Sequence, residues 1–268
     1  MLSLLSKSIV VFLIVLSGSF SFSQDLAVNQ LLKDLEANGM LDKAVERSLN
    51  RIRNKNEMLA KREAEKESKL RNKLAANVKA VDLNKDFIYG KIDADVSIIL
   101  YSDFECSYCQ RFHAVPKAVV DQMPEKVNLV WRNFPLPFHD PMATKEAMGG
   151  ICVHEQGGNA AFWKYADQVV VTTKLNGQGI PVEQGGDPIT KLVSSQGIDV
   201  DKFKACLSSP ATKSKIDEDL KSGADVGIRG TPGVILINRS NGRAAALAGA
   251  VPAEVVTKAV QALLVKGK

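Results

Sequence analysis

Cys106 and Cys109 stand three positions apart, where an apolar run gives way to a helical pattern. The start of a helix carries partial positive charge and unsatisfied N–H groups, so a thiol placed there ionises more easily. A thiolate at Cys106 could attack a disulfide, and Cys109, one helical turn further on, is spaced to resolve the mixed disulfide or re-form an internal one. The spacing therefore predicts thiol–disulfide exchange, with Cys106 as the attacking and Cys109 as the resolving cysteine.

Metal binding is the main alternative for this spacing, because zinc sites use the same interval between cysteines. A zinc site needs two further ligands; His113 follows one turn later, but the sequence has no second paired motif. We therefore expect no metal and no cofactor. A binding module without enzymatic activity stays open: a holdase chaperone, or a copper-handling protein that uses Cys106 and Cys109 as soft ligands.

A strand–helix–strand unit is expected to position the two cysteines. Residues 87–89 and 96–101 are β-branched and aromatic runs separated by turn residues, which predicts two strands. The helix that follows should begin near Cys106 and be kinked by Pro116. Residues 127–131 predict another buried strand and complete a β-α-β unit.

The second half of the chain is expected to be helical before it returns to the sheet. A mostly helical segment covers residues from about 139 to 209, and residues 212–226 form a further helix. A turn at 230–232 leads into a strand, and the turn residues at 241–242 predict a hairpin. Residues 254–265 close the chain as a helix. Within the helical segment we expect helices at 142–156 and 160–171 and a glycine-rich connection at 176–186.

Two motifs in this order resemble the DsbA-like branch of the thioredoxin superfamily. They are Phe104-Glu-Cys-Ser-Tyr-Cys109 after a strand and, beyond the helical insertion, Gly230-Thr231-Pro232 before a strand. The resemblance covers residues from about 82 to the C-terminus. It implies an α/β thioredoxin fold with an inserted helical subdomain and an N-terminal helical extension. It also implies protein thiol–disulfide oxidoreductase activity at the Cys-Ser-Tyr-Cys site.

The same resemblance implies which residues hold a substrate. In that family the proline matching Pro232 is cis and faces the active-site disulfide, and the residue before it helps to hold the substrate chain. Thr231 and Pro232 are therefore expected to bind substrate, together with Ser107 and Tyr108 between the cysteines. The implied partners are unfolded or misoxidised exported proteins, and a membrane or soluble redox partner that renews the disulfide.

Ser107 and Tyr108 replace the Pro-His pair of DsbA itself, so an imidazole that could stabilise the thiolate is missing. Asp103 and Glu105 add negative charge, which opposes ionisation of Cys106. We expect a Cys106 pKa above the roughly 3.5 of DsbA and below the roughly 8.5 of a free cysteine, and hence a weaker oxidant. A threonine before the proline is also the choice of isomerase-type members, so disulfide formation and isomerisation both stay open.

Cys152 and Cys206 both fall in the helical segment, in surroundings that are apolar on one side. In an oxidising compartment we expect them to form a structural disulfide. Two buried free thiols, or a regulatory pair, are the alternatives.

The first residues have the pattern of a secretory signal peptide: Lys7, an apolar run at 9–16 and small residues up to 23. An uncleaved membrane anchor is the alternative, although the run is shorter than the roughly 20 residues that span a bilayer. We expect residues 1–23 to be removed and the mature protein to be soluble in the periplasm, where disulfides persist. The net charge is +5, but the basic residues are interleaved with acidic ones rather than gathered in one block, so we expect no nucleic-acid partner.

Residues 24–80 are expected to form a helical arm ahead of the domain at 81–268. They contain no proline and one glycine, Gly39, which predicts a short helix followed by a longer one. The apolar stripe of the arm is too small for a core of its own, so we expect a homo-oligomer, either a dimer or a trimer. A surface helix folded back on its own domain is the alternative. The stripe consists of Leu31, Leu35, Leu41, Val45, Leu49 and Ile52.

Overall fold

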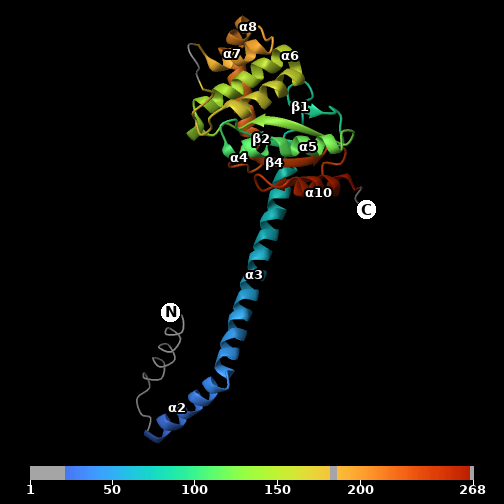
Figure 1. Cartoon of the computed structure of the whole chain (residues 1–268). Helices are drawn as coiled ribbons and strands as arrows, with labels where there is room; N and C mark the ends of the chain where they lie inside the picture. The colour runs from blue at the N-terminus through green and yellow to red at the C-terminus, as the bar shows by residue number, and fades with distance from the viewer. Residues whose placement is uncertain (1–21, 182–185, 266–268) are drawn as a thin grey trace. The chain divides into compact units, whose positions relative to one another are not determined.

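The computed structural model describes residues 22–181 and 186–265 of the 268-residue chain (Figure 1). Residues 1–21, most of the expected signal peptide, and residues 182–185 of the glycine-rich connection lie outside the described residues. The chain divides after Glu65 into two compact units.

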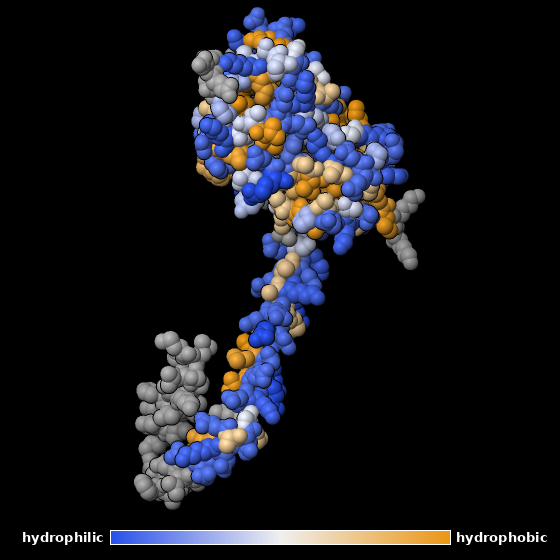
Figure 2. Space-filling model, viewed as in Figure 1, coloured by the Kyte–Doolittle hydropathy of each residue, from blue (hydrophilic) through white to orange (hydrophobic). Residues whose placement is uncertain are grey.

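Two helices lie on either side of Gly39, as expected: α2 (Phe22–Ala37) and α3 (Met40–Ala75). The φ of Gly39 is +60°, a left-handed conformation that glycine adopts without strain. The side chain of Leu41 lies outside the described part of the chain. Apolar side chains on α3 stay about half exposed (Figure 2); they are Val45, Leu49, Ile52, Met58 and Leu59.

The second unit is built on a five-stranded sheet in the order β1-β3-β2-β4-β5. Its strands are β1 (Phe87–Gly90), β2 (Val96–Ser102), β3 (Val127–Asn133), β4 (Gly233–Asn238) and β5 (Ala244–Leu247). β2 and β3 run parallel, and the other neighbouring strands run antiparallel. Parallel strands need a crossover. The helices α4 (Ser107–Phe112) and α5 (Ala114–Gln122) supply it, so the expected β-α-β unit is confirmed.

Two helices differ in detail from the sequence prediction. The helix expected to run from Cys106 past Pro116 is divided at His113, because Pro116 has no N–H to bond the carbonyl of Phe112. α6 continues across the gap expected between 156 and 160, with a kink at Gly158. The remaining elements are η1 (Pro137–His139), α6 (Met142–Thr172), α7 (Pro188–Ser195), α8 (Val200–Leu207), α9 (Pro210–Asp225) and α10 (Ala253–Leu264).

β2 lies at the centre of the unit and is buried along its whole length. Successive side chains of a strand point to opposite faces of the sheet. Ile98 and Leu100 accordingly join a core cluster with residues of α5, α6 and α10. Ile99 and Tyr101 join a second cluster on the other face. The carboxyl end of this rigid strand leads directly to Cys106.

The chain between α3 and β1 packs against the sheet. Ala75 and Val78 are buried in the same cluster as Ile99 and Tyr101. Arg132 of β3 donates from Nη2 to the carbonyl oxygen of Lys79 at 2.9 Å. The last residues of the expected 24–80 arm therefore belong to the second unit.

Candidate active site

Cys106 ends the loop after β2 and is the N-cap of α4. Its backbone is extended, with φ −85° and ψ 120°, and its side chain makes no capping hydrogen bond. Cys106 and Cys109 are free thiols and are almost fully buried, with 5% and 4% of their surface exposed. α4 thus holds both thiols within its first turn.

The two thiols differ in acidity. A hydrogen bond from Cys109 is the largest cause that lowers the pKa of Cys106 to about 5; Thr231 and the backbone N–H groups of Cys109 and Tyr108 add to it, and burial opposes it. Burial, followed by the neighbouring Cys106, raises the pKa of Cys109 well above its ordinary value. At neutral pH Cys106 is therefore a thiolate and Cys109 a thiol. The pKa of Cys106 falls within the range expected from the sequence.

The loop that carries Thr231 and Pro232 lies against Cys106. The Thr231-Pro232 peptide bond is cis, as the resemblance implied. The Cys106 sulfur lies 3.5 Å from the carbonyl oxygen of Thr231. The Thr231 hydroxyl is buried and has no other hydrogen-bond partner among the described residues, yet it is one of the groups that lower the pKa of Cys106. Its O–H is thus available to the thiolate.

Two aromatic side chains, Tyr108 and Phe138, are largely exposed. Tyr108, between the cysteines, is 60% exposed, and the Arg111 guanidinium lies 4.6 Å from the centre of its ring. Phe138 of η1 is 74% exposed and stands next to His139. Ser107 is only partly exposed. The exposure of Phe138 was not predicted, because no local pattern distinguishes it from a core phenylalanine.

Asp103, three residues before Cys106, organises the loop through its buried carboxylate. It accepts hydrogen bonds from the N–H groups of Glu105 and Leu136, both at 2.9 Å, and lies 2.7 Å from Nδ1 of His139. Burial is the largest influence on Asp103 and raises its pKa. The carboxylate therefore ties the cysteine loop to the segment after β3, a contact that the sequence did not reveal.

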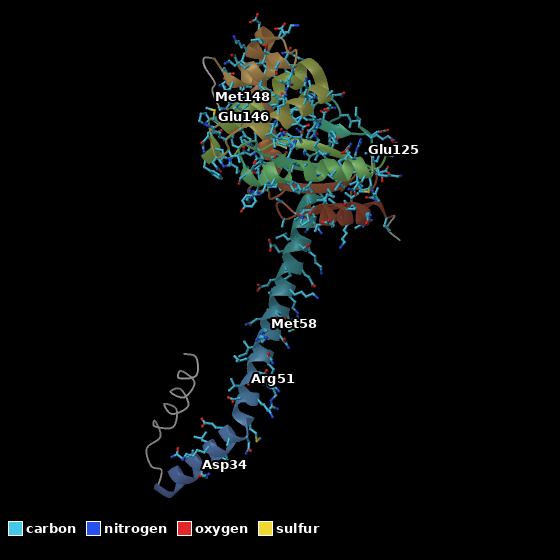
Figure 3. All side chains as sticks on the ribbon, viewed as in Figure 1. Asp34, Arg51, Met58, Glu125, Glu146 and Met148 are labelled. Atoms are coloured by element: carbon cyan, nitrogen blue, oxygen red, sulfur yellow. A yellow bond between two sulfur atoms is a disulfide. The ribbon has the colours of Figure 1, made fainter. Side chains whose placement is uncertain are left out.

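Glu105 is also fully buried, although it directly precedes Cys106. Its carboxylate accepts hydrogen bonds from the Thr173 hydroxyl and, at 3.3 Å, from the N–H of Gly179. Glu146 of α6 (Figure 3) is buried as well; burial, followed by the charge of Glu105, raises its pKa to about 9. Asp103 and Glu105 were expected to oppose ionisation of Cys106, but neither is among the largest influences on its pKa.

Cys152 of α6 and Cys206 of α8 form a disulfide, with their Cα atoms 5.6 Å apart. Cys152 is fully buried. The bond joins two helices of the inserted segment and uses neither thiol of the active-site pair. It links positions separated by 54 residues of sequence.

His113, the candidate metal ligand nearest to the cysteines in the sequence, instead contacts a carboxylate on α6. Its Nε2 lies 2.6 Å from the carboxylate of Asp167 on α6, and Lys117 bonds the same carboxylate. Gln110 donates to the carbonyl oxygen of Val170 at 2.7 Å, so α4 is also fixed to α6. Within 22–181 and 186–265, no three His, Cys, Asp or Glu side chains are grouped so that they could hold a metal ion.

The fold and the cysteine site together define the class of protein. A family model described as Thioredoxin matches residues 82–250, and the chain belongs to this family. The expected α/β thioredoxin fold with inserted helices and an N-terminal helix is confirmed, in the arrangement of DsbA-like proteins.

The chain is similar to a crystal structure of Pseudomonas aeruginosa DsbA2, with a TM-score of 0.60 and 28% identity over 69% of this chain and 97% of that one. The probable disulfide bond formation protein D of Bacillus cereus is 26% identical over 150 residues, 54% of this chain and 67% of its own length. The Na(+)/H(+) antiporter NhaA 3 of Salinispora tropica is 29% identical over 153 residues, 57% of this chain but only 22% of the antiporter. This chain thus spans about a fifth of that relative. None of its described helices has the length and apolar character needed to cross a membrane.

Proposed function

We propose that this protein forms or isomerises disulfides in exported polypeptides. The observation that carries the proposal is the unequal acidity of two adjacent thiols, of which Cys106 has a pKa of about 5 and lies 3.5 Å from the backbone of Thr231. A stabilised thiolate attacks disulfides at neutral pH and leaves readily from a mixed disulfide. Cys106 is thus suited to exchange with a substrate disulfide, and Cys109 is suited to resolve the mixed disulfide.

In the oxidising direction the reaction starts from a Cys106–Cys109 disulfide. A substrate thiolate attacks the Cys106 sulfur, a mixed disulfide forms, and Cys109 leaves and takes up a proton. A second substrate thiolate attacks the substrate sulfur of the mixed disulfide, and Cys106 leaves as its stabilised thiolate. Two electrons pass from substrate to protein, and a redox partner must remove them to restore the disulfide.

Isomerisation starts instead from the reduced pair. The Cys106 thiolate attacks a substrate disulfide and releases a substrate thiolate, which can then attack a different sulfur, so no electrons are transferred overall. The Cys106 pKa of about 5 lies above the roughly 3.5 of DsbA. The reduced form is therefore favoured less strongly than in DsbA. A site of this kind is suited both to disulfide formation and to isomerisation.

The substrate chain is proposed to bind across Thr231, Pro232, Ser107 and Tyr108. The position of the Thr231 carbonyl beside the reactive sulfur supports this, because an extended chain ending in a mixed disulfide must pass that backbone. The exposed ring of Tyr108 offers an amphipathic surface at low entropic cost.

The decisive experiment measures oxidation of a reduced dithiol polypeptide and reactivation of a scrambled one by wild type, Cys106→Ser and Cys109→Ser. We expect Cys106→Ser to be inactive in both assays and Cys109→Ser to accumulate a mixed disulfide. Full activity of Cys106→Ser would rule out the proposal. Copper binding by the wild type without activity in either assay would favour the copper-handling alternative, and suppression of aggregation alone would favour a holdase.

We propose export to the periplasm because residues 9–16 form an apolar run and because one relative is a probable disulfide bond formation protein. Disulfides persist in such a compartment and not in the cytosol. Cell fractionation with mass determination of the mature N-terminus tests this proposal; an uncleaved chain in the cytosol would refute it.

The helical arm is proposed to join copies of this chain. Val45, Leu49, Ile52 and Leu59 recur at intervals of four, three and seven residues and are about half exposed on α3. Those intervals place the side chains along one seam, as in helices that pair with another helix. Burial of this seam against the arm of a second copy would bring several active sites together, which would favour isomerisation of one substrate.

A further inference from the structure

The loop at residues 173–181, which follows α6, is fixed to the residue directly before the reactive cysteine. The N–H of Asn176 donates to the carbonyl oxygen of Glu105 at 2.9 Å. The Glu105 carboxylate accepts hydrogen bonds from the Thr173 hydroxyl and from the N–H of Gly179, the latter at 3.3 Å. Because Glu105 anchors this loop at three points, we call residues 173–181 the Glu105 loop.

The Glu105 loop is also closed on itself and packs against η1. The N–H of Lys174 donates to the carbonyl oxygen of Gly179 at 3.0 Å. A Cβ added to Gly177 would lie 3.3 Å from the carbonyl oxygen of His139, so the loop backbone approaches η1 closely. The loop therefore lies beside the segment that leads to Cys106. Its exposed polar side chains are Lys174, Asn176 and Gln178.

Glu146 of α6 faces this anchor from inside the protein. The Thr173 hydroxyl gives its one proton to Glu105, and neither carboxyl oxygen of Glu146 receives a hydrogen bond among the described residues. A buried carboxylate without a donor costs free energy, whereas a protonated carboxyl can donate to a neighbouring carboxylate. Burial and the charge of Glu105 raise the pKa of Glu146 to about 9, which agrees with one proton held between the two groups at neutral pH.

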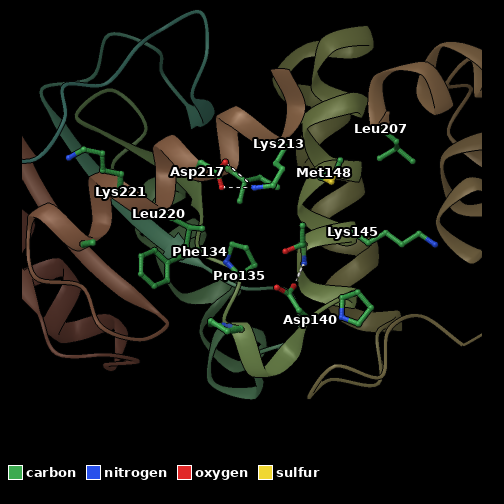
Figure 4. Close-up of a pocket in the computed structure, with 15 residues that line it drawn as sticks. Phe134, Pro135, Asp140, Lys145, Met148, Leu207, Lys213, Asp217, Leu220 and Lys221 are labelled. Carbon is green, nitrogen blue, oxygen red and sulfur yellow. Dashed lines mark hydrogen bonds and ion pairs between the residues drawn. The ribbon is translucent and has the colours of Figure 1, made fainter. Parts of the chain in front are cut away.

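The other groups around Glu146 also favour its protonated form. The charge of Asp103 further raises the pKa of Glu146. Tyr165 donates its O–H to the backbone carbonyl of Glu146 and not to the carboxyl group. Lys145, the residue before Glu146, extends away from the pocket between α6 and α9 (Figure 4) and pairs with Asp187. Its charge is therefore used elsewhere.

We propose that the Glu105 loop is a second wall of the substrate site, where Asn176 binds the main chain of the substrate. Glu105 and Glu146 are its positioning residues, because the proton that they share keeps the loop in place. This inference rests on the thiol–disulfide exchange proposed above and adds residues to its substrate site.

Asn176 is the exposed residue of the loop whose own N–H bonds to Glu105. A chain in a mixed disulfide with Cys106 must pass this position, and a side-chain amide both donates to and accepts from a peptide group. Loss of the shared proton places two negative charges side by side in the protein interior, which is unfavourable. Ionisation of Glu146 should therefore weaken the hold of Glu105 on the loop.

The first test compares reduction of the oxidised protein by a dithiol peptide and by dithiothreitol, which has no peptide groups. The ratio of the two second-order rate constants separates binding of the peptide chain from the chemistry of the thiols. Asn176→Ala should lower this ratio at least about fivefold at neutral pH, equivalent to about 1 kcal/mol. Asn84→Ala changes an exposed asparagine before β1 and is the matched control, which should keep the ratio of wild type. A ratio for Asn176→Ala equal to that of wild type would overturn the inference.

The second test follows the same ratio at rising pH. From about pH 7 to about pH 10 it should fall at least about threefold in wild type, because Glu146 ionises. In Glu146→Gln it should stay constant, because the amide donates to Glu105 throughout this range. Comparing the two proteins cancels the titration of the peptide thiols. The same pH dependence in both proteins would overturn the inference.

Carbon-13 NMR of the glutamate carboxyl groups gives a readout that does not depend on activity. In wild type one carboxyl should titrate near pH 9, and this signal should be missing in Glu146→Gln. Glutamate signals that all titrate below neutral pH in wild type would overturn the inference even if the variant did not fold. Failure of the proposed function would look different, because Cys106→Ser would then act on the dithiol peptide like wild type.

Discussion

The sulfur of Cys106 lies 3.5 Å from the carbonyl oxygen of Thr231, and the buried hydroxyl of the same threonine has no other partner among the described residues. The thiol donates to the carbonyl only while it is protonated. After ionisation the carbonyl opposes the thiolate and the hydroxyl stabilises it, because the hydroxyl donates. Thr231 therefore interacts with the protonated thiol of Cys106 through its carbonyl oxygen and with the thiolate through its hydroxyl.

Thr231→Val removes the hydroxyl and keeps the carbonyl and the shape of the side chain. We expect the pKa of Cys106 to rise by about one unit, which corresponds to one hydrogen bond to a charged group. Absorbance titration of the thiolate measures this pKa. Thr231→Ser keeps the hydroxyl and should titrate like wild type. An unchanged pKa in Thr231→Val would mean that the hydroxyl does not reach the sulfur.

The pH dependence of stability provides a second prediction. The Cys106 pKa is about 5 in the folded reduced protein and roughly 8.5 in an unfolded chain. Between these values the unfolded state binds more protons, so the reduced form gains stability as pH rises through this window and loses it as pH falls towards 5. The raised pKa of Cys109 acts only at higher pH.

The oxidised form has no titrating thiol at this site and provides the reference. We expect the Tm of the reduced form minus that of the oxidised form to decrease from about pH 8 to about pH 5. Reduced Cys106→Ala should lose this dependence when its Tm is followed over the same range. A difference independent of pH in wild type would contradict the low pKa.

The fold around the cysteine pair was predictable because its signals are local. β2 is buried on both faces, so residues 96–101 form an apolar run, interrupted only by Ser97, that ends at the cysteine loop. The position of Pro116 predicted a helix kink, since a proline removes one specific hydrogen bond. Only the exact break at His113 needed the structure.

The surroundings of the thiol were not predictable, because they depend on residues distant in sequence. Asp103 and Glu105 look like solvent-exposed acids beside Cys106, yet their carboxylates bond His139 and Thr173 inside the protein. The sequence does not show that these carboxylates are buried or which residues they bond. The packing of Val78 on the sheet was not predictable for a similar reason: an apolar position does not show whether it packs on a sheet or on another helix.

The buried carboxylate of Asp103 should be important for stability. Asp103→Ala leaves the N–H groups of Glu105 and Leu136 and the ring of His139 without their acceptor. We expect a loss of about 3 kcal/mol in the free energy of unfolding, as for other buried pairs that lose one partner. Urea denaturation of the oxidised protein measures it. Asp103→Asn, which keeps one acceptor oxygen, should lose less; equal stability of Asp103→Ala and wild type would contradict the network.

The Cys152–Cys206 disulfide should stabilise the inserted helices without taking part in exchange. Chain entropy for a separation of 54 residues gives an upper value of about 4 kcal/mol for its contribution to stability. The double variant Cys152→Ser/Cys206→Ser should lose up to this amount, while its rate of exchange with dithiothreitol remains that of wild type. A large loss of that rate in a variant that is still folded would assign the pair a redox role.

The arm should determine oligomeric state and, through it, isomerase activity. Leu49→Glu/Ile52→Glu puts two charges on the exposed seam of α3, whereas Asn50→Glu/Asn54→Glu adds the same charge to the opposite side of the helix. In the full-length mature protein, we expect sedimentation to show a dimer or trimer for wild type and for the asparagine variant, and a monomer for the seam variant.

The seam variant should also lose reactivation of scrambled substrate and keep oxidation of a dithiol peptide, because exchange needs one site and reshuffling benefits from several. A wild type that is monomeric at every concentration would refute the arm proposal without affecting the chemistry of Cys106.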